Sequence, residues 1–215
     1  MTRGLERPIS FGSVYEDALL RRSHQLVAMG HAHLIPADLA NLEETEITGK
    51  LCDAMNAVLE AEDAPTWATI VTVVDDQPES VAGKTGKRRP RTDVCVRCIH
   101  PRPEHRFRFE AKRLNGKAAL RAYLGDEGML ALVRGYYGDL PYAGMIGYVQ
   151  TDTCGGWSER IKDAIREAPG TYDVIEPVDF TSVGVDVPEP VFCSAHHATA
   201  PEGRTRITHT LLLCA

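Results

Sequence analysis

Apolar residues recur at helical spacing in the first third of the chain. Tyr15, Leu19 and Leu26 follow this spacing and predict a helix over residues 13–29. After a polar joint that contains glycine and proline, a second apolar stripe predicts a helix over residues 43–60. The first third of the chain is therefore predicted to be mainly helical.

The middle of the chain is predicted to alternate between strands and helices. β-branched and apolar residues at 67–74 indicate a strand buried on both faces. A polar loop follows at 75–91, and its length is typical of a functional or mobile segment. The next segments are predicted as strands at 92–99 and 106–112, a helix at 117–137 that breaks near 125–128, and a short strand at 143–150.

The last third of the chain adds a helix and a β-hairpin. Helical spacing resumes over residues 157–168. Residues 191–196 and 205–213 read as strands that pair across a turn. The last third is therefore predicted to be mainly β-structure.

No internal repeat or linker divides the sequence, so we expect one domain over residues 1–215. Its core would span about 43–150, with the helix at 13–29 before it and a β-rich extension at 155–215 after it. The core order is helix, strand, strand, strand, helix, strand. This order predicts an α/β fold in which helices flank a mixed central sheet.

Composition places the chain among ordinary globular proteins. Of its 215 residues, 43% are apolar and 25% are charged. No apolar run is long enough to span a bilayer, and the chain does not open with the pattern of a secretory signal. Six scattered cysteines favour reduced thiols over a disulfide scaffold. We therefore expect a cytoplasmic protein without a membrane partner.

The net charge of −6 conceals one strongly basic segment. Between Lys84 and Arg121, 13 Lys and Arg stand against three acidic residues, which gives +10. The rest of the chain holds 11 basic and 27 acidic residues, which gives −16. A basic segment in an acidic protein indicates a local anionic partner, although a solvated basic surface would show the same charge.

Within this segment, the predicted strand at 106–112 has one apolar and one charged face. Alternation directs Arg108, Glu110 and Lys112 to the charged face, where Glu110 and Lys112 lie about 7 Å apart. The hairpin brings Asp93, at the start of the partner strand, beside Glu110. The alternative interpretation is an ordinary Glu–Lys pair on an exposed strand.

Two carboxylates and an ammonium in one cleft suit the hydrolysis of a phosphodiester. Carboxylates bind a hard cation such as Mg²⁺, which lowers the pKa of bound water and neutralises phosphate charge. A lysine orients or activates that water, or stabilises developing charge. Asp93 and Glu110 are the predicted metal ligands and Lys112 the predicted catalytic lysine, with Asp75 and Asp76 as rival aspartates.

Residues 43–150 resemble the PD-(D/E)xK nuclease superfamily, whose core runs αβββαβ. The resemblance rests on Arg91-Thr92-Asp93-Val94 and on Phe109-Glu110-Ala111-Lys112-Arg113-Leu114, with 16 residues between Asp93 and Glu110. Thr92 stands where the named motif has proline. The resemblance implies a restriction-endonuclease-like fold and a nuclease that uses Mg²⁺ or Mn²⁺.

The same resemblance implies two further site residues. Family members commonly place a glutamate on the helix before the sheet as a metal or water ligand. Glu46 is the predicted residue, with Glu43 and Glu44 as competitors. An exposed glutamate cluster that interacts with the helix dipole is the alternative. Gln150 matches the glutamine that some members carry after the second helix, and it is the predicted accessory residue.

Basic residues around the predicted site would contact phosphates regardless of nucleic-acid sequence. The predicted nucleic-acid-binding set is Lys84, Lys87, Arg88, Arg89, Arg91, Arg108 and Arg113. The expected function is a metal-dependent nuclease in phage defence or DNA processing, with DNA favoured over RNA. The alternatives are a catalytically silent nucleic-acid-binding module and a structural subunit of a larger complex. The resemblance implies a second copy as one possible partner, since many such folds dimerise to cut two strands. A helicase or ATPase is the other, because the sequence contains no ATP-binding loop.

Two other patterns are weaker. Cys95 and Cys98 have zinc-ligand spacing, but on one regular strand they point to opposite faces, so buried thiols are favoured. His196 and His197 also alternate, and at most one of them is expected to face any site. Ser194 has no nucleophile-elbow pattern around it.

Overall fold

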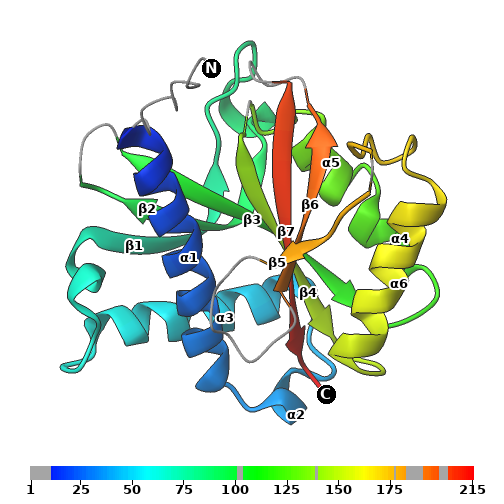
Figure 1. Cartoon of the computed structure of the whole chain (residues 1–215). Coiled ribbons are helices and arrows are strands. Elements are labelled where there is room, and N and C mark those ends of the chain that lie inside the picture. Colours follow the sequence, from blue (N-terminus) through cyan, green and yellow to red (C-terminus); the bar gives the residue numbers. More distant parts are fainter. Residues whose placement is uncertain (1–10, 101–103, 139, 177, 183–190, 199–202) are drawn as a thin grey trace, which may run out of the picture.

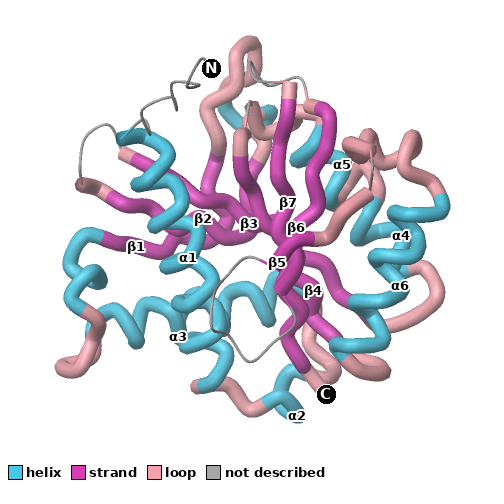
Figure 2. The backbone as a smooth tube through the Cα atoms, viewed as in Figure 1, coloured by secondary structure: helices cyan, strands magenta, loops and turns pink. Residues whose placement is uncertain are grey.

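The computed structural model describes residues 11–100, 104–138, 140–176, 178–182, 191–198 and 203–215. In this part of the chain, helices flank a seven-stranded mixed sheet with the strand order β1-β2-β3-β4-β7-β6-β5 (Figures 1 and 2). The fold is therefore α/β, as predicted. No helix in the described ranges is long and apolar enough to cross a membrane.

The elements have the following bounds. The helices are α1 (Phe11–Ala32), α2 (Pro36–Leu39), α3 (Glu44–Glu60), α4 (Ala119–Leu124), α5 (Met129–Val133) and α6 (Cys154–Glu167), and the 3₁₀ turns are η1 (Thr66–Ile70) and η2 (Gly86–Arg88). The strands are β1 (Val71–Pro78), β2 (Arg91–Cys98), β3 (His105–Leu114), β4 (Tyr142–Val149), β5 (Thr181–Ser182), β6 (Val191–His197) and β7 (Arg204–Leu213).

Two layers of apolar side chains lie on the two faces of the sheet. One layer joins α1 and α3 to residues of β2 and β3 such as Val96 and Phe109. The other joins α4, α5 and α6 to residues of β4 and β7 such as Met145 and Leu211. Figure 1 accordingly shows α1 and α3 beside the β1–β3 half of the sheet and the later helices beside the other half.

The C-terminal hairpin continues the sheet beyond β4, and the predicted pairing of its two strands, β6 and β7, is confirmed. β7 lies between β4 and β6 and pairs in parallel with β4 from Tyr142↔Arg206 to Val149↔Leu213. Its residues from Ile207 to Leu212 are buried. An apolar strand of this kind is expected inside a sheet, where neighbours cover both of its edges and both of its faces.

Two local expectations can be compared with the structure. Residues 66–70 form η1, so the first strand begins only at Val71, and it alternates between buried Val73 and exposed Thr72. The predicted burial on both faces was wrong, because only the face that carries Val71 and Val73 is buried. The predicted helix break is confirmed between α4 and α5. A Cβ at Gly128 would lie 2.3 Å from the Tyr123 carbonyl oxygen, so glycine is needed in this turn.

The predicted site lies where the pairing between β2 and β3 ends. Their antiparallel ladder runs from Cys98↔His105 to Val94↔Phe109. From Phe109 onward, β3 pairs in parallel with β4, beginning at Gly144. Asp93 is therefore the first residue of β2 beyond the ladder, and β3 continues past it toward the start of α3.

Candidate active site

The structure brings Asp93, Glu110 and Lys112 together where β2 leaves β3. Lys112 Nζ lies 2.9 Å from Glu110 Oε1, as alternation along β3 predicts. Asp93 Oδ2 accepts the Ala111 N–H at 2.7 Å and lies 3.9 Å from Lys112 Nζ. The Asp93 side chain thus replaces the missing ladder partner of β3, and this contact fixes its carboxylate beside the other two groups.

The helix glutamate at this cluster is Glu44 and not Glu46. Glu44 Oε1 accepts from Lys112 Nζ at 3.1 Å, and Glu44 Oε2 accepts from the Arg113 N–H at 3.1 Å. Glu46 Oε2 instead accepts from the Glu43 N–H at 2.9 Å. A glutamate three residues after the N-cap turns back to satisfy the free N–H at the helix start, which directs Glu46 away from the cluster.

Gln150 positions the start of α3. Its Nε2 donates to the carbonyl oxygens of Leu39 and Leu42, each at 2.9 Å. The Arg113 guanidinium holds the same joint through Glu43, with Nη1 donating to Glu43 Oε1 at 2.9 Å. The predicted accessory glutamine therefore holds the segment from which Glu44 reaches the cluster.

Burial sets the protonation of the two β-strand carboxyl groups. Burial and then the charge of Asp93 raise the pKa of Glu110 to about 7, against the opposing effect of Lys112. Burial also raises the pKa of Asp93, while Lys112 and the Ala111 N–H act in the opposite direction. Near neutral pH, Glu110 is consequently divided between its acid and its carboxylate.

Lys112 is an ammonium in this arrangement. Its burial disfavours the charge, but the carboxylates of Glu110, Asp93 and Glu44 outweigh burial and raise its pKa. Nζ also donates to the Ala111 carbonyl oxygen at 2.8 Å. Oxygen atoms from four residues therefore surround one cationic nitrogen, and the side chain is only 14% exposed.

Tyr137 is a member of the cluster that the sequence did not reveal. Its hydroxyl donates to Glu110 Oε2 at 2.6 Å, and its side chain is buried. The pKa of Tyr137 is raised, first by burial and then by the charge of Glu110. The only signal was an aromatic pair, Tyr136-Tyr137, in the turn after a helix, and this pattern does not show where a hydroxyl points.

The donor atoms suit a small divalent cation only in part. Within the described ranges, no three His, Cys, Asp or Glu side chains are grouped so that they could hold a metal ion, which also leaves zinc at Cys95 and Cys98 without support. Mg²⁺ is commonly held by one or two carboxylates and completes its octahedron with water and phosphate oxygens. Asp93 and Glu110, which lie 3.9 Å and 2.9 Å from Lys112 Nζ, are the two carboxylates that could serve this role.

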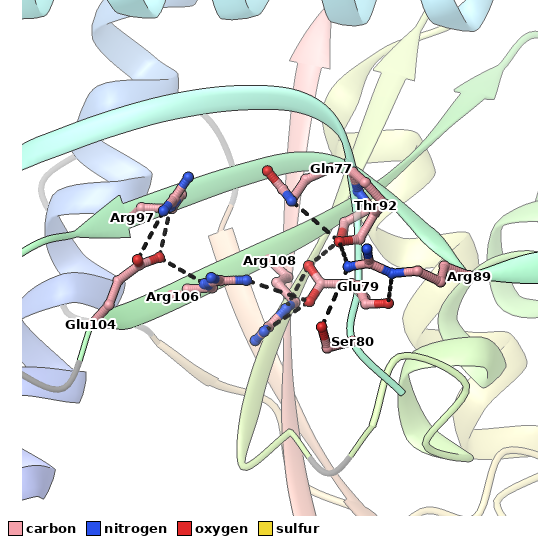
Figure 3. Close-up of polar contacts among 10 residues, drawn as sticks. Gln77, Glu79, Ser80, Arg89, Thr92, Arg97, Glu104, Arg106 and Arg108 are labelled. Carbon is pink, nitrogen blue, oxygen red and sulfur yellow. Dashed lines mark hydrogen bonds and ion pairs between the residues drawn. The ribbon is translucent and has the colours of Figure 1, made fainter. Parts of the chain in front are cut away.

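Most of the predicted phosphate-binding arginines are paired inside the protein. Arg108 Nη2 donates to Glu79 Oε2 at 3.0 Å, and Thr92 donates to Glu79 Oε1 at 2.8 Å (Figure 3). Glu79 is buried, and this would raise its pKa, but the hydrogen bond and charge of Arg108 lower it overall. Arg89 donates to the Glu79 carbonyl oxygen at 2.9 Å and so fixes the loop that follows β1.

The other predicted phosphate-binding residues are either paired within the protein or exposed. Arg91 pairs with Asp76, one of the rival aspartates, and Asp76 is thereby occupied away from the cluster. Arg113 pairs with Glu43. Lys87 and Arg88 are exposed on η2, and their side chains have no charged or hydrogen-bonded partner among the residues that the structure describes. These two, with Lys84, are the members of the set best placed to meet an anionic partner.

A second polar cluster lies on β6 and β7, closed to solvent. Ser194 Oγ lies 2.7 Å from His196 Nε2 and 2.9 Å from His209 Nε2, and His209 Nδ1 lies 3.2 Å from the Tyr123 hydroxyl. All four residues are buried, whereas His197 is exposed, so the predicted division of neighbouring histidines is confirmed. Burial lowers the pKa of both His196 and His209, which keeps the cluster neutral and makes it structural.

Comparisons of the chain with protein-family models, with curated proteins and with solved structures found no match.

Proposed function

We propose that the protein is a metal-dependent nuclease of restriction-endonuclease-like fold that hydrolyses phosphodiester bonds, with DNA as the favoured substrate. One observation supports this proposal above all others. The Lys112 ammonium is held by Glu110, Glu44 and the Ala111 carbonyl at 2.8–3.1 Å, with Asp93 at 3.9 Å. An exposed Glu–Lys pair would not need three carboxylates from three separate elements.

The burial of the cluster also favours a chemical role. A buried carboxyl group whose pKa lies near neutrality, next to a specific charged partner, is more frequent at functional sites than elsewhere. Glu110 has these properties, with a pKa raised to about 7 and with Lys112 beside it. Tyr137 fixes one Glu110 oxygen and leaves the other toward Lys112.

Asp93 and Glu110 would hold Mg²⁺ or Mn²⁺, which when bound would lower the pKa of a water molecule and neutralise charge on the phosphate. The chain's own groups would position the reactants. Lys112 is protonated in the present arrangement, so it can donate a hydrogen bond to a phosphate oxygen or orient a water molecule. Glu44, fixed by the Arg113 N–H, would hold the lysine in place.

The basic segment supports an anionic substrate. Lys87 and Arg88 are exposed on the loop between β1 and β2, so phosphate contacts there would not require an internal ion pair to be broken. Arg89 and Arg108 would act indirectly, by fixing the shape of this loop around Glu79 (Figure 3).

The test is cleavage of supercoiled, linear and single-stranded DNA, and of RNA, with Mg²⁺, with Mn²⁺ or with EDTA. Wild type would be compared with Glu110→Gln and Lys112→Met, and with Lys50→Ala as a control on an exposed lysine of α3. Thermal unfolding of each variant would separate loss of chemistry from loss of fold. Cleavage that needs the metal and is lost only in the two cluster variants is expected. Cleavage that persists in EDTA and in Glu110→Gln would refute the proposal.

A catalytically silent nucleic-acid-binding module is the second candidate, and one observation favours it. The cation at the centre of the carboxylates is already supplied by Lys112, and the described residues contain no ready group of three metal-binding side chains. Under this hypothesis, wild type would bind nucleic acid with the same affinity in Mg²⁺ and in EDTA and would cut none of the substrates.

A further inference from the structure

The loop between β1 and β2 contacts the candidate site through Lys84 and Tyr136. Lys84 Nζ lies 3.8 Å from the centroid of the Tyr136 ring, and it also lies 3.5 Å from the Tyr136 carbonyl oxygen. Lys84 belongs to the loop, and Tyr136 belongs to the turn after α5, so segments from both sides of the site meet here. Figure 1 shows this loop and α5 at the same end of the sheet.

Tyr136 is connected to the cluster by a single aromatic contact. Its ring meets the Tyr137 ring edge to face, with the centroids 5.2 Å apart and an interplanar angle of 90°. Tyr137 in turn donates to Glu110 Oε2 at 2.6 Å. The Tyr136 ring is therefore separated from Glu110 by one side chain, that of Tyr137, so a nucleotide on this ring would be a neighbour of the one at the site.

The two tyrosines differ in exposure. Tyr137 is 7% exposed and Tyr136 is 50% exposed. Neither contact of Lys84 with Tyr136 is strong, because the ammonium meets the ring at an open surface and its hydrogen bond is long. Lys84 can thus leave the ring for a phosphate at little cost.

A hollow beside Lys84 gives the same region room for a ligand. It has a volume of about 520 Å³, and its lining includes Lys84 and the hydroxyl-bearing residues Ser80 and Thr85. Cationic and hydroxyl groups of this kind are suited to phosphate and sugar oxygens. An exposed aromatic ring next to such a hollow matches what a nucleotide needs, which is a surface for its base and donors for its phosphate.

We propose that Tyr136 stacks an unpaired nucleobase that flanks the phosphate at the site, and that Lys84 binds the adjacent phosphate. The substrate class is therefore single-stranded nucleic acid, or the single-stranded end of a duplex. Bases inside a duplex already have both faces stacked on neighbours, so only an unpaired base can use this ring. This inference rests on the proposed function, because it takes the phosphodiester to lie at Glu110.

The test is binding, measured by fluorescence anisotropy in EDTA, where no metal-dependent cleavage occurs. The probes are a short single-stranded DNA, its RNA counterpart and a blunt duplex, each also made with a fluorescent adenine analogue that is quenched by stacking. Tyr136→Ala removes the ring and Tyr136→Phe keeps it. Tyr15→Ala is the matched control, because Tyr15 is similarly exposed at 42% but lies on α1, stacked on His105.

Tyr136→Ala is expected to weaken single-strand binding about tenfold and to abolish the quenching. Tyr136→Phe and Tyr15→Ala should bind and quench like wild type, and Lys84→Ala should weaken binding and reduce its salt dependence. Stronger binding of the DNA or of the RNA probe would identify which strand the subsite accepts. Equal binding and quenching by wild type and Tyr136→Ala, or no single-strand binding by wild type, would overturn the inference.

These results are separable from those on the proposed function. If Tyr136-dependent binding occurs but no probe is ever cut, the nuclease proposal fails and the base subsite stands. If the protein cuts DNA but Tyr136→Ala leaves both binding and quenching intact, the subsite fails and the nuclease proposal stands.

Discussion

Glu44 contacts Lys112, whereas Glu46 was the glutamate predicted from the sequence to reach the site, and substitution of each can distinguish the two. Glu44→Gln keeps the size of the side chain but removes one of the carboxylates in contact with Lys112 and weakens the hydrogen bond from the Arg113 N–H. Glu46→Gln changes the same chemical group two residues away. Because a glutamine oxygen also accepts from the Glu43 N–H, the helix start should be preserved in that variant.

The expected magnitudes follow from these contacts. Hydrogen bonds to charged groups are about twice as strong as neutral ones, and partners that orient active groups typically contribute 10–100-fold to activity. Glu44→Gln should therefore lower the cleavage rate about 10–100-fold. The Glu44 side chain is 30% exposed, so its effect on the free energy of unfolding should stay near 1 kcal/mol. Glu46→Gln should change neither quantity measurably.

The assay is the initial rate of plasmid nicking at saturating Mg²⁺, with thermal unfolding measured on the same preparations. Similar unfolding temperatures for the two variants, together with a rate loss confined to Glu44→Gln, would agree with the geometry. Loss of activity in a folded Glu46→Gln variant, with full activity in Glu44→Gln, would refute the assignment of Glu44 to the cluster. In that case Glu46 would have to leave its position at the helix start and reach the site, as the sequence first suggested.

Three further predictions concern stability. Gln150→Ala should lower the free energy of unfolding by about 1–3 kcal/mol in urea titrations, because the carbonyl oxygens of Leu39 and Leu42 each lose one hydrogen bond. Glu79→Gln should be more costly, about 3–5 kcal/mol, since Arg108 would keep a largely buried charge without its carboxylate, and an unchanged unfolding midpoint would contradict this. Burial lowers the pKa of His196 from 6.5 to about 4. The unfolded chain therefore binds the proton first, and stability should fall as the pH drops from 6.5 toward 4, by about 3 kcal/mol from His196 alone. Urea midpoints that stay constant over this range would show that the His196–His209 cluster does not titrate as described.

The sequence was sufficient for features that depend on local periodicity. Alternation along β3 correctly placed Glu110 and Lys112 on one side, and the hairpin correctly brought Asp93 beside them. The break between α4 and α5 was also visible, because Gly125 and Gly128 interrupt the apolar pattern. In each case, neighbours in sequence or across one turn determine the geometry, so the pattern contains the necessary information.

Features that depend on tertiary contacts were not accessible in this way. The direction of the Tyr137 hydroxyl depends on how the turn after α5 lies against β3, which no local pattern encodes. The place of β7 between β4 and β6 depends on pairing between strands more than 50 positions apart in the chain, because Tyr142 pairs with Arg206. The sequence predicted that residues 205–213 pair with 191–196, but it could not identify β4 as the second neighbour of β7.

The basic segment shows why composition alone could not define a nucleic-acid surface. Arg89, Arg108 and Arg113 were predicted to bind phosphates, and each instead donates to a carboxylate or carbonyl group within the chain. Arginine is suited to this role, because its planar fork satisfies several acceptors at once and stays charged when partly buried. The exposed cations that remain are Lys87 and Arg88. Local charge therefore overstated the number of free cations, although it correctly located the loop that carries them.

The same internal pairs explain which glutamate reaches the cluster. Arg113, at the end of β3, holds Glu43, and Gln150, just beyond β4, holds the two carbonyl groups that precede it. The ends of the adjacent strands β3 and β4 thus hold the segment before α3, residues 39–43, close to Lys112. With this segment held there, the first residue of the helix faces the ammonium, and the third closes the helix start. Gln150→Ala should reduce activity because it loosens the segment that positions Glu44. Glu44→Gln already removes the carboxylate that this segment positions, so Gln150→Ala should add little further loss. The double variant should therefore lose less activity than the product of the two separate losses.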